Sequence, residues 1–229
     1  MTTKAGGEPK VVTLDVSGGK IKASIHGTGP CVVVLGPGAG GTRQTPQLLR
    51  VVAALDPSRY TTVLFNFPYT EGGRKFPDAP AVLEETVAAV AAFGRAELRA
   101  RTLVLGGRSM AGRIASQAAA KGLKCDGLVF LAYPLHPPGE VTKLRNAHLP
   151  AIKVPMLFLQ GTRDVFARLD LLEATVSGLG SLAHLALFPD ADHSFKTPRG
   201  AAASSKETET QVMTRLAEWL DMLTVGRHA

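Results

Sequence analysis

The stretch Gly106-Gly107-Arg108-Ser109-Met110-Ala111-Gly112 decides the fold, because it joins two segments of different character. It follows an apolar run from Thr102 to Leu105 that is typical of a buried strand, and it precedes a helical pattern from Ile114 to Lys121. Small residues around Ser109 permit a very sharp turn, which holds a serine at strained backbone angles with its hydroxyl clear of the sheet. The stretch therefore predicts a nucleophilic serine between a strand and a helix.

The pattern around this serine is Gly-x-Ser-x-Ala-Gly rather than the full Gly-x-Ser-x-Gly, because Ala111 stands at the position of the second glycine. Alanine is still small, so the departure weakens the match without breaking it. Taken alone, the stretch is equally compatible with a serine that caps a helix after a glycine-rich turn. The rest of the chain has to supply the partners that a nucleophile needs.

A serine hydroxyl needs a general base, and the base needs an acid that orients it. Asp164 follows an apolar run that ends at Gln160, and His193 follows a second run from Ala183 to Phe188. Both runs read as strands, so the sequence predicts that Asp164 and His193 meet Ser109 at one edge of a sheet. Asp190 and Asp192 suit a turn instead, because they are too close to His193 in sequence to need a fold to meet it.

A glycine-rich loop supplies the third requirement, a pocket of backbone N–H groups for an oxyanion. The apolar run from Cys31 to Leu35 ends in Gly36-Pro37-Gly38-Ala39-Gly40-Gly41, and such a loop lets the backbone approach a substrate closely. We predict that the amides of Ala39 and Met110 hold the oxyanion, and that Gly38 lies against the substrate.

Four motifs, LGPGAGG, GGRSMAG, GTRD and DADHSF, occur in the order expected of the α/β-hydrolases, which the chain resembles from about residue 11 to residue 225. They look most like small, lidless members related to dienelactone hydrolase. Two further segments, FNFPY and YPLHPPG, are similar to a hydrolase-like group with a vertebrate testis-expressed protein and a domain of a histone-acetyltransferase subunit. The resemblance implies Ser109, Asp164 and His193 as a catalytic triad. Pro37 departs from the histidine of many relatives.

The alternation of apolar runs and helical patterns predicts an α/β fold, the three-layer αβα arrangement of an α/β-hydrolase with a mostly parallel eight-stranded sheet. We expect one domain over residues 11–225, a disordered tail over residues 1–10 and an antiparallel opening pair of strands. The expected strands are Val11–Val16, Lys20–Ile25, Val32–Leu35, Thr61–Phe65, Thr102–Leu105, Leu128–Ala132, Met156–Leu159 and Ala183–Leu187.

The longest connection, from Tyr133 to Val154, lies where larger relatives insert a lid. It is too short for a cap domain, so we expect an open, shallow pocket. The side chains predicted to line it are those of Tyr69, Phe76, Met110, Leu135, His136 and Phe166.

Composition limits the partners. The formal charge is +7, but the basic residues are scattered and aromatic residues make up only 6%, which argues against a nucleic-acid surface. No apolar run approaches the length of a transmembrane helix, and the first ten residues lack the apolar core of a secretory signal. Two cysteines in or beside buried strands suggest a reduced, cytoplasmic protein. We expect no metal or organic cofactor, a small acyl substrate as partner, and leave a homodimer open.

Two other functions remain alternatives. The spacing Gly36-x-Gly38-x-x-Gly41 matches a dinucleotide fingerprint, but the next strand ends at Asn66 where an acidic residue is wanted, and Glu71 falls in the following loop. A hydrolase-like module without catalysis would keep the fold and bind a protein. The favoured prediction is a serine hydrolase that acts on a small carboxylic ester, thioester or lactone through an acyl-enzyme. Six basic residues near the motifs are compatible with an anionic substrate, but solvated side chains that keep the protein soluble are the preferred interpretation: Arg43, Arg74, Lys75, Arg108, Arg113 and Arg163.

Overall fold

The computed structural model describes residues 8–225, and its eight strands form one sheet. Most of the predicted disordered tail, residues 1–10, lies outside the described residues. Residues 8–10 are described, and Lys10 already pairs with Ile25 in the first strand. The first strand therefore begins one residue before the predicted Val11.

The strands run in the order β1-β2-β4-β3-β5-β6-β7-β8 across the sheet. The first two strands pair antiparallel, β2 pairs antiparallel with β4, and all later pairs are parallel, which confirms the predicted mostly parallel sheet with an antiparallel opening pair. The strands are β1 (Lys10–Val16), β2 (Gly19–His26), β3 (Cys31–Gly36), β4 (Tyr60–Phe65), β5 (Thr102–Arg108), β6 (Gly127–Leu131), β7 (Met156–Gly161) and β8 (Ala183–Phe188).

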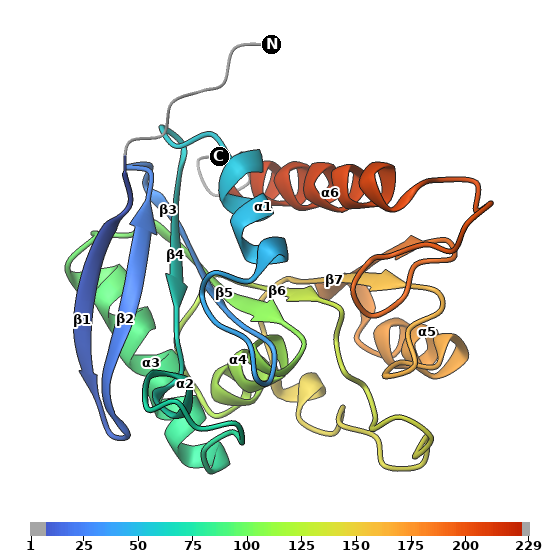
Figure 1. The fold of residues 1–229 in the computed structure, drawn as a ribbon, viewed down its shortest axis with the longest axis horizontal. Helices are drawn as coiled ribbons and strands as arrows, with labels where there is room; N and C mark the ends of the chain where they lie inside the picture. The colour runs from blue at the N-terminus through green and yellow to red at the C-terminus, as the bar shows by residue number, and fades with distance from the viewer. Residues whose placement is uncertain (1–7, 226–229) are drawn as a thin grey trace.

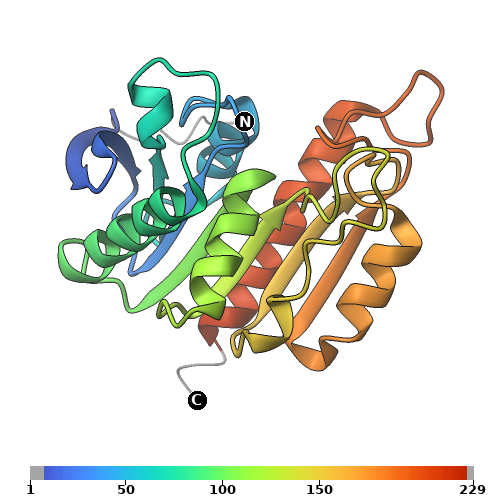
Figure 2. The same ribbon diagram turned by 90° about the horizontal axis from the view of Figure 1, so that it is seen from below.

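Helices cover both faces of the sheet (Figure 1). One face carries α1 (Pro46–Ala54) and α6 (Ser205–Val225). The other carries α3 (Pro80–Ala96), α4 (Met110–Ala120) and α5 (Leu169–Ser177). Figure 2 shows these three helices in front of the sheet with α6 behind it. The predicted three-layer arrangement is thus confirmed.

The alternation of side chains along the central strands builds two separate cores. Val32 and Val34 of β3 pack in the layer of α3 and α4, whereas Val33 and Leu35 pack in the layer of α1 and α6. Successive side chains of a strand point to opposite faces, so a continuous apolar run fills both layers. The apolar runs of the sequence are therefore central strands.

The connection between β6 and β7 contains one 3₁₀ turn, η1 (Leu149–Ala151), and no cap domain. The remaining short elements are α2 (Pro68–Glu71), which follows β4, and η2 (Gly180–Leu182), which precedes β8. The expectation of a lidless fold is confirmed. Between residues 8 and 225, no helix combines the length and apolar character needed to cross a membrane.

Candidate active site

The carboxyl ends of the parallel strands bring together segments that are far apart in sequence. Ser109 follows β5, Asp164 follows β7, and His193 follows β8. Because β5 to β8 are parallel neighbours in the sheet, their carboxyl ends lie at one edge. This edge holds the residues that the sequence singled out.

Ser109 sits in the strained turn that its neighbours suggested. Its φ of 49° and ψ of −110° are unfavourable for a residue with a side chain, at a cost of about 1–3 kcal/mol. Its backbone N–H donates to the carbonyl of Leu131 at 2.9 Å, and α4 begins at the next residue, Met110. The N-terminus of α4 favours negative charge beside the serine.

Ala111 fits the turn because two glycines nearby lack side chains. A Cβ at Gly36 would lie 2.7 Å from the Cβ of Ala111, and a Cβ at Gly107 would lie 2.9 Å from it. Gly107 also has a φ of +141°. The close packing of β3 against the start of α4 thus explains Gly36, the first glycine of the apparent dinucleotide fingerprint, without a nucleotide.

Hydrogen bonds connect Ser109, His193 and Asp164 in one line. The Nε2 atom of His193 is 2.9 Å from the Oγ of Ser109, and its Nδ1 atom is 2.7 Å from the Oδ2 of Asp164. A carboxylate only accepts hydrogen bonds, so the neutral imidazole carries its proton on Nδ1. Nε2 then accepts from the serine hydroxyl, as a general base must.

The carboxylate of Asp164 is buried and receives two further hydrogen bonds. The side-chain amide of Gln160 donates to its Oδ2 at 2.5 Å, and the N–H of Phe166 donates to its Oδ1 at 2.8 Å. The sequence reasoning missed Gln160, although a polar residue at the end of the buried run Met156–Gln160 was a signal. Its Oε1 accepts the N–H of Tyr133 at 2.8 Å, so it links β7 to the segment after β6.

Phe166 lies against the imidazole, with its ring centroid 4.4 Å from that of His193. It is the one predicted lining residue whose ring contacts the histidine. The preceding residue, Val165, leaves 63% of its surface exposed. Phe166 therefore places apolar surface beside the imidazole of His193.

The glycine loop after β3 is held in place by the segment after β4. The N–H of Gly40 donates to the hydroxyl of Tyr69 at 3.0 Å, and the N–H of Arg43 donates to the Oδ1 of Asn66 at 2.6 Å. Ala39, a predicted oxyanion donor, is exposed at the top of this loop. Gly38 lies close to the serine, since a Cβ at this position would be 3.6 Å from that of Ser109.

Three predicted lining residues have other environments. Tyr69 and Leu135 expose none of their surface, and His136 exposes 2%, so none of their side chains lines an open pocket in this conformation. Tyr69 supports the glycine loop instead. Phe76 lies at the opposite extreme, with 83% of its surface exposed. Sequence proximity to the motifs therefore did not distinguish packing from lining.

His136 supports the loop that follows Asp164. Its Nε2 accepts the N–H of Arg168 at 2.9 Å, and its Nδ1 donates to the carbonyl of Pro137 at 2.8 Å. Its own N–H donates to the carbonyl of Phe166 at 2.9 Å. These bonds fix both the ring and the loop, which makes His136 a structural support for Phe166.

Three of the six basic residues near the motifs, Arg74, Arg108 and Arg113, have side-chain partners within the protein. Arg74 pairs with Asp78 at 2.6 Å, and Arg113 donates to the side chain of Gln117 at 3.2 Å. Arg108 donates to the segment that carries His193, as described below. Among residues 8–225, no three or more His, Cys, Asp and Glu side chains gather in a way that would hold a metal ion.

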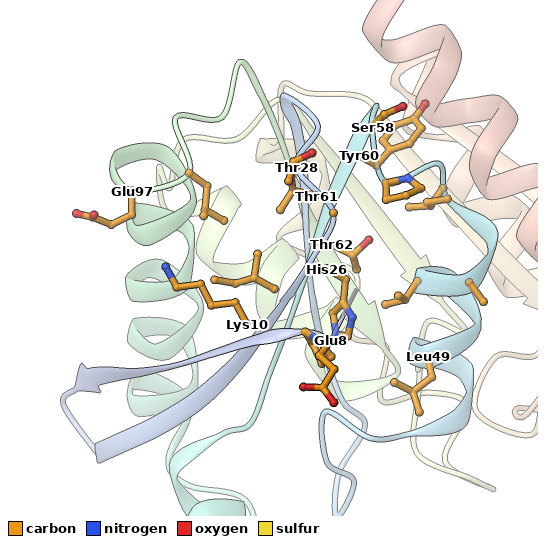
Figure 3. A pocket seen from close by; sticks show the side chains of 18 residues that line it. Glu8, Lys10, His26, Thr28, Leu49, Ser58, Tyr60, Thr61, Thr62 and Glu97 are labelled. Atoms are coloured by element: carbon orange, nitrogen blue, oxygen red, sulfur yellow. The ribbon is translucent and has the colours of Figure 1, made fainter. Parts of the chain in front are cut away.

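A cavity of about 1010 Å³ lies at the opposite edge of the sheet, where β2 ends and β4 begins. Figure 3 shows Leu49 of α1 and His26 and Thr62 of the strands pointing into it. Burial and the charge of Arg43 lower the pKa of His26. No residue that lines this cavity comes from the loops of Ser109, Asp164 and His193, so the cavity is separate from the candidate active site.

Comparison with known proteins adds a family and a set of similar folds. The family model described as "Alpha/beta hydrolase domain" matches residues 30–221. A lidless α/β serine hydrolase from Xanthomonas campestris is 20% identical, with a TM-score of 0.71 over 94% of this chain and 96% of that one. A dienelactone hydrolase from Anabaena variabilis is 19% identical, with a TM-score of 0.73 over 94% and 99%. An esterase from Pyrococcus furiosus is 14% identical, with a TM-score of 0.70 over 94% and 92%.

Proposed function

Because the chain belongs to the α/β-hydrolase family, we propose that it is a serine hydrolase that cleaves small carboxylic esters, thioesters or lactones through an acyl-enzyme. The observation that carries the proposal is the continuous hydrogen-bonded line from Ser109 through His193 to Asp164. The strained backbone of Ser109 is a second support, because strain of this kind persists only where the surrounding structure enforces it.

In the proposed reaction, Nε2 of His193 takes the hydroxyl proton as the Oγ of Ser109 attacks the acyl carbonyl. Asp164 keeps the imidazole in the required tautomer and stabilises the imidazolium that forms. The amides of Ala39 and Met110 stabilise the oxyanion of the tetrahedral intermediate. The protonated His193 then gives its proton to the leaving alcohol or thiol. The same base activates a water molecule, which releases the acid and regenerates the serine.

The absence of a cap domain in the connection between β6 and β7 supports a small substrate. A cap would supply apolar walls for a long acyl chain, whereas here the ring of Phe166 packs against the imidazole and the preceding residue, Val165, is exposed. The similar folds include a dienelactone hydrolase and an esterase, which agrees with ester or lactone chemistry.

Labelling with a fluorophosphonate probe tests the proposal at the level of the nucleophile. Only an activated serine attacks such a probe at an appreciable rate, so we expect wild-type protein to be labelled and Ser109→Ala not to be. Hydrolysis of p-nitrophenyl acetate should fall on the order of 10⁶-fold in Ser109→Ala. Ser181→Ala, at an exposed position outside the three loops, is the control for a serine substitution.

An unlabelled wild-type protein would contradict the proposal and favour the non-catalytic module instead. Labelling that persists in Ser109→Ala would place the nucleophile elsewhere. A thermal shift with NAD or NADP in the unlabelled case would support the dinucleotide alternative, which uses the loop from Gly36 to Gly41.

A further inference from the structure

Arg108, the residue before the proposed nucleophile, contacts the segment that carries His193. Its Nη2 atom donates to the carbonyl of His193 at 3.2 Å and to the Oγ of Ser194 at 2.9 Å. His193 and Ser194 lie 85 and 86 positions after Arg108 in the sequence. One side chain thus joins the end of β5, at Arg108, to the loop that presents the proposed general base.

The same guanidinium also reaches the glycine loop. A Cβ at Gly38 would lie 3.0 Å from the Nη1 atom of Arg108. The two ends of the guanidinium therefore face different loops, with Nη2 toward His193 and Nη1 toward Gly38. A planar group with donors at fixed angles can occupy such a position, whereas the single ammonium of lysine cannot.

The guanidinium of Arg108 is partly buried, although a cation is usually exposed to solvent. Burial lowers the pKa of its guanidinium, and the charges of Asp164 and Asp192 act in the opposite direction. The two acceptors of Nη2 are neutral, a carbonyl and a hydroxyl. Burying a cation is unfavourable unless it is hydrogen-bonded. A side chain that serves only solubility would stay exposed, so the bonds between Arg108 and the His193 segment indicate an internal role.

The loop that carries His193 has hydrogen bonds of its own on either side of the histidine, and Arg108 adds a bond to the carbonyl of His193 itself. Between β8 and α6, Asp192 organises a tight turn by accepting the N–H groups of Ser194 and Lys196 at 2.7 and 2.9 Å. The N–H of Arg163 donates to the carbonyl of Ala191 at 2.9 Å. These bonds shape the turn on either side of His193, and the carbonyl of His193 itself is held by Arg108.

We propose that Arg108 is a positioning residue, whose guanidinium fixes the His193 segment against the glycine loop and so keeps the imidazole within hydrogen-bonding distance of Ser109. The inference rests on the proposed function and adds the residue that sets the spacing of nucleophile, base and oxyanion loop. It assigns Arg108 an internal role in place of recognition of an anionic substrate.

Steady-state kinetics with p-nitrophenyl acetate separate the two roles. In Arg108→Gln we expect kcat to fall on the order of 10²-fold, because a small displacement of a catalytic group has an effect of this size. KM should stay near the wild-type value, since the interaction is with the protein and not with the substrate. Arg108→Lys should restore little of the loss. Arg199→Gln is the charge-matched control, because it removes an exposed arginine from the connection between β8 and α6 that carries His193.

Amide hydrogen exchange tests the positioning itself and does not depend on turnover. In Arg108→Gln, exchange of the amides of residues 190–196 should become faster, while the rest of the sheet keeps the wild-type rates. Ser194→Ala removes one acceptor and leaves the cation in place, so it provides a milder variant if Arg108→Gln does not fold. We expect it to slow labelling by the fluorophosphonate probe.

Three results would overturn this role for Arg108. They are a wild-type kcat in Arg108→Gln, a raised KM with unchanged kcat, and full recovery of activity in Arg108→Lys. Unchanged labelling in Ser194→Ala would also contradict it. If the wild-type protein is neither labelled nor active, the proposed function fails, and the exchange rates of Arg108→Gln still decide whether Arg108 holds the loop.

Discussion

At the scale of single residues, the turn around Ser109 depends on where Cβ atoms are absent. Gly36 and Gly107 leave room for the methyl group of Ala111, and this explains how the turn forms without the second glycine of the usual pattern. Alanine at position 111 therefore fills space at the first turn of α4 that glycine leaves empty at position 36 of β3. It leaves the backbone of Ser109 in its strained conformation.

Gly36→Ala should destabilise the protein by about 1–3 kcal/mol, because the new methyl group would overpack a closed site. Its Cβ would lie 2.7 Å from the Cβ of Ala111 and 2.7 Å from the ring of Phe65. The double variant Gly36→Ala with Ala111→Gly should recover part of the loss, since one of the two clashes disappears. Urea unfolding of the four proteins of this cycle measures the coupling. Equal losses in both backgrounds would show that positions 36 and 111 do not compete for space.

At the scale of elements, the loop between β7 and α5 carries Asp164 and Phe166 and is held from the side by the segment after β6. Gln160 and His136 supply the links, one to the N–H of Tyr133 and one to the N–H of Arg168. In larger hydrolases of the kind that the sequence resembles, a lid would occupy this connection. Here the same segment packs down and supports the acid and the aromatic ring beside the base.

His136→Ala should lower the free energy of unfolding by about 1–3 kcal/mol, because the N–H of Arg168 loses its acceptor. Activity should fall as well, since Phe166 lies on the same loop and contacts His193. His136→Gln should recover part of both, because its Oε1 can accept the same N–H. Urea unfolding and esterase assays measure the effects, with His184→Ala on the exposed side of β8 as the control. A His136→Ala protein with wild-type stability and activity would remove the support role.

At the scale of the whole molecule, we expect two half-buried histidines outside the proposed triad, His26 and His148, to couple folding to pH. Burial, followed by the charge of Arg113, lowers the pKa of His148, whose Nε2 donates to the hydroxyl of Ser116 at 2.7 Å. His26 shows the same direction, with burial and then Arg43 as causes. When a histidine has a lower pKa in the folded state, the unfolded chain binds more protons as the pH falls. Folding therefore becomes less favourable in acid.

Urea unfolding between about pH 8 and about pH 5 should show this loss of stability beginning near the ordinary histidine value of 6.5. The loss should be smaller in His148→Gln and in His26→Gln, because each variant removes one group that takes up a proton on unfolding. His184→Gln, at an exposed position, should keep the wild-type dependence. Identical pH profiles for all four proteins would contradict the coupling.

Much of the fold could be read from local patterns. The run from Cys31 to Leu35 is apolar at every position, which is typical of a strand buried on both faces, and the structure places it in the centre of the sheet. The hairpin of β1 and β2 and the helix after Ser109 were recognisable in the same way. The ends of the elements were less certain. β1 begins at Lys10 and α4 begins at Met110, and both residues precede the starts expected from the sequence.

The order of the motifs also predicted which residues would meet. Ser109, Asp164 and His193 each follow a parallel strand, and parallel strands end at a common edge, so their proximity could be inferred without coordinates. Their catalytic role stays a prediction until the labelling experiment is done. The lining residues were harder to assign, because Tyr69, Leu135 and His136 are near the motifs in sequence but are buried by packing.

The sequence by itself determined the alternation of strands and helices, the mostly parallel sheet, and the three side chains proposed for catalysis, because hydrophobic periodicity and turn chemistry act over short distances. Only the tertiary structure decided the roles of Arg108, Gln160 and His136. Each of them is held by a partner from a different segment, and which segments touch depends on how the loops pack at the edge of the sheet. Sequence patterns do not show such contacts. A residue that is buried for structural support and a residue that contacts substrate therefore cannot be distinguished from the sequence alone.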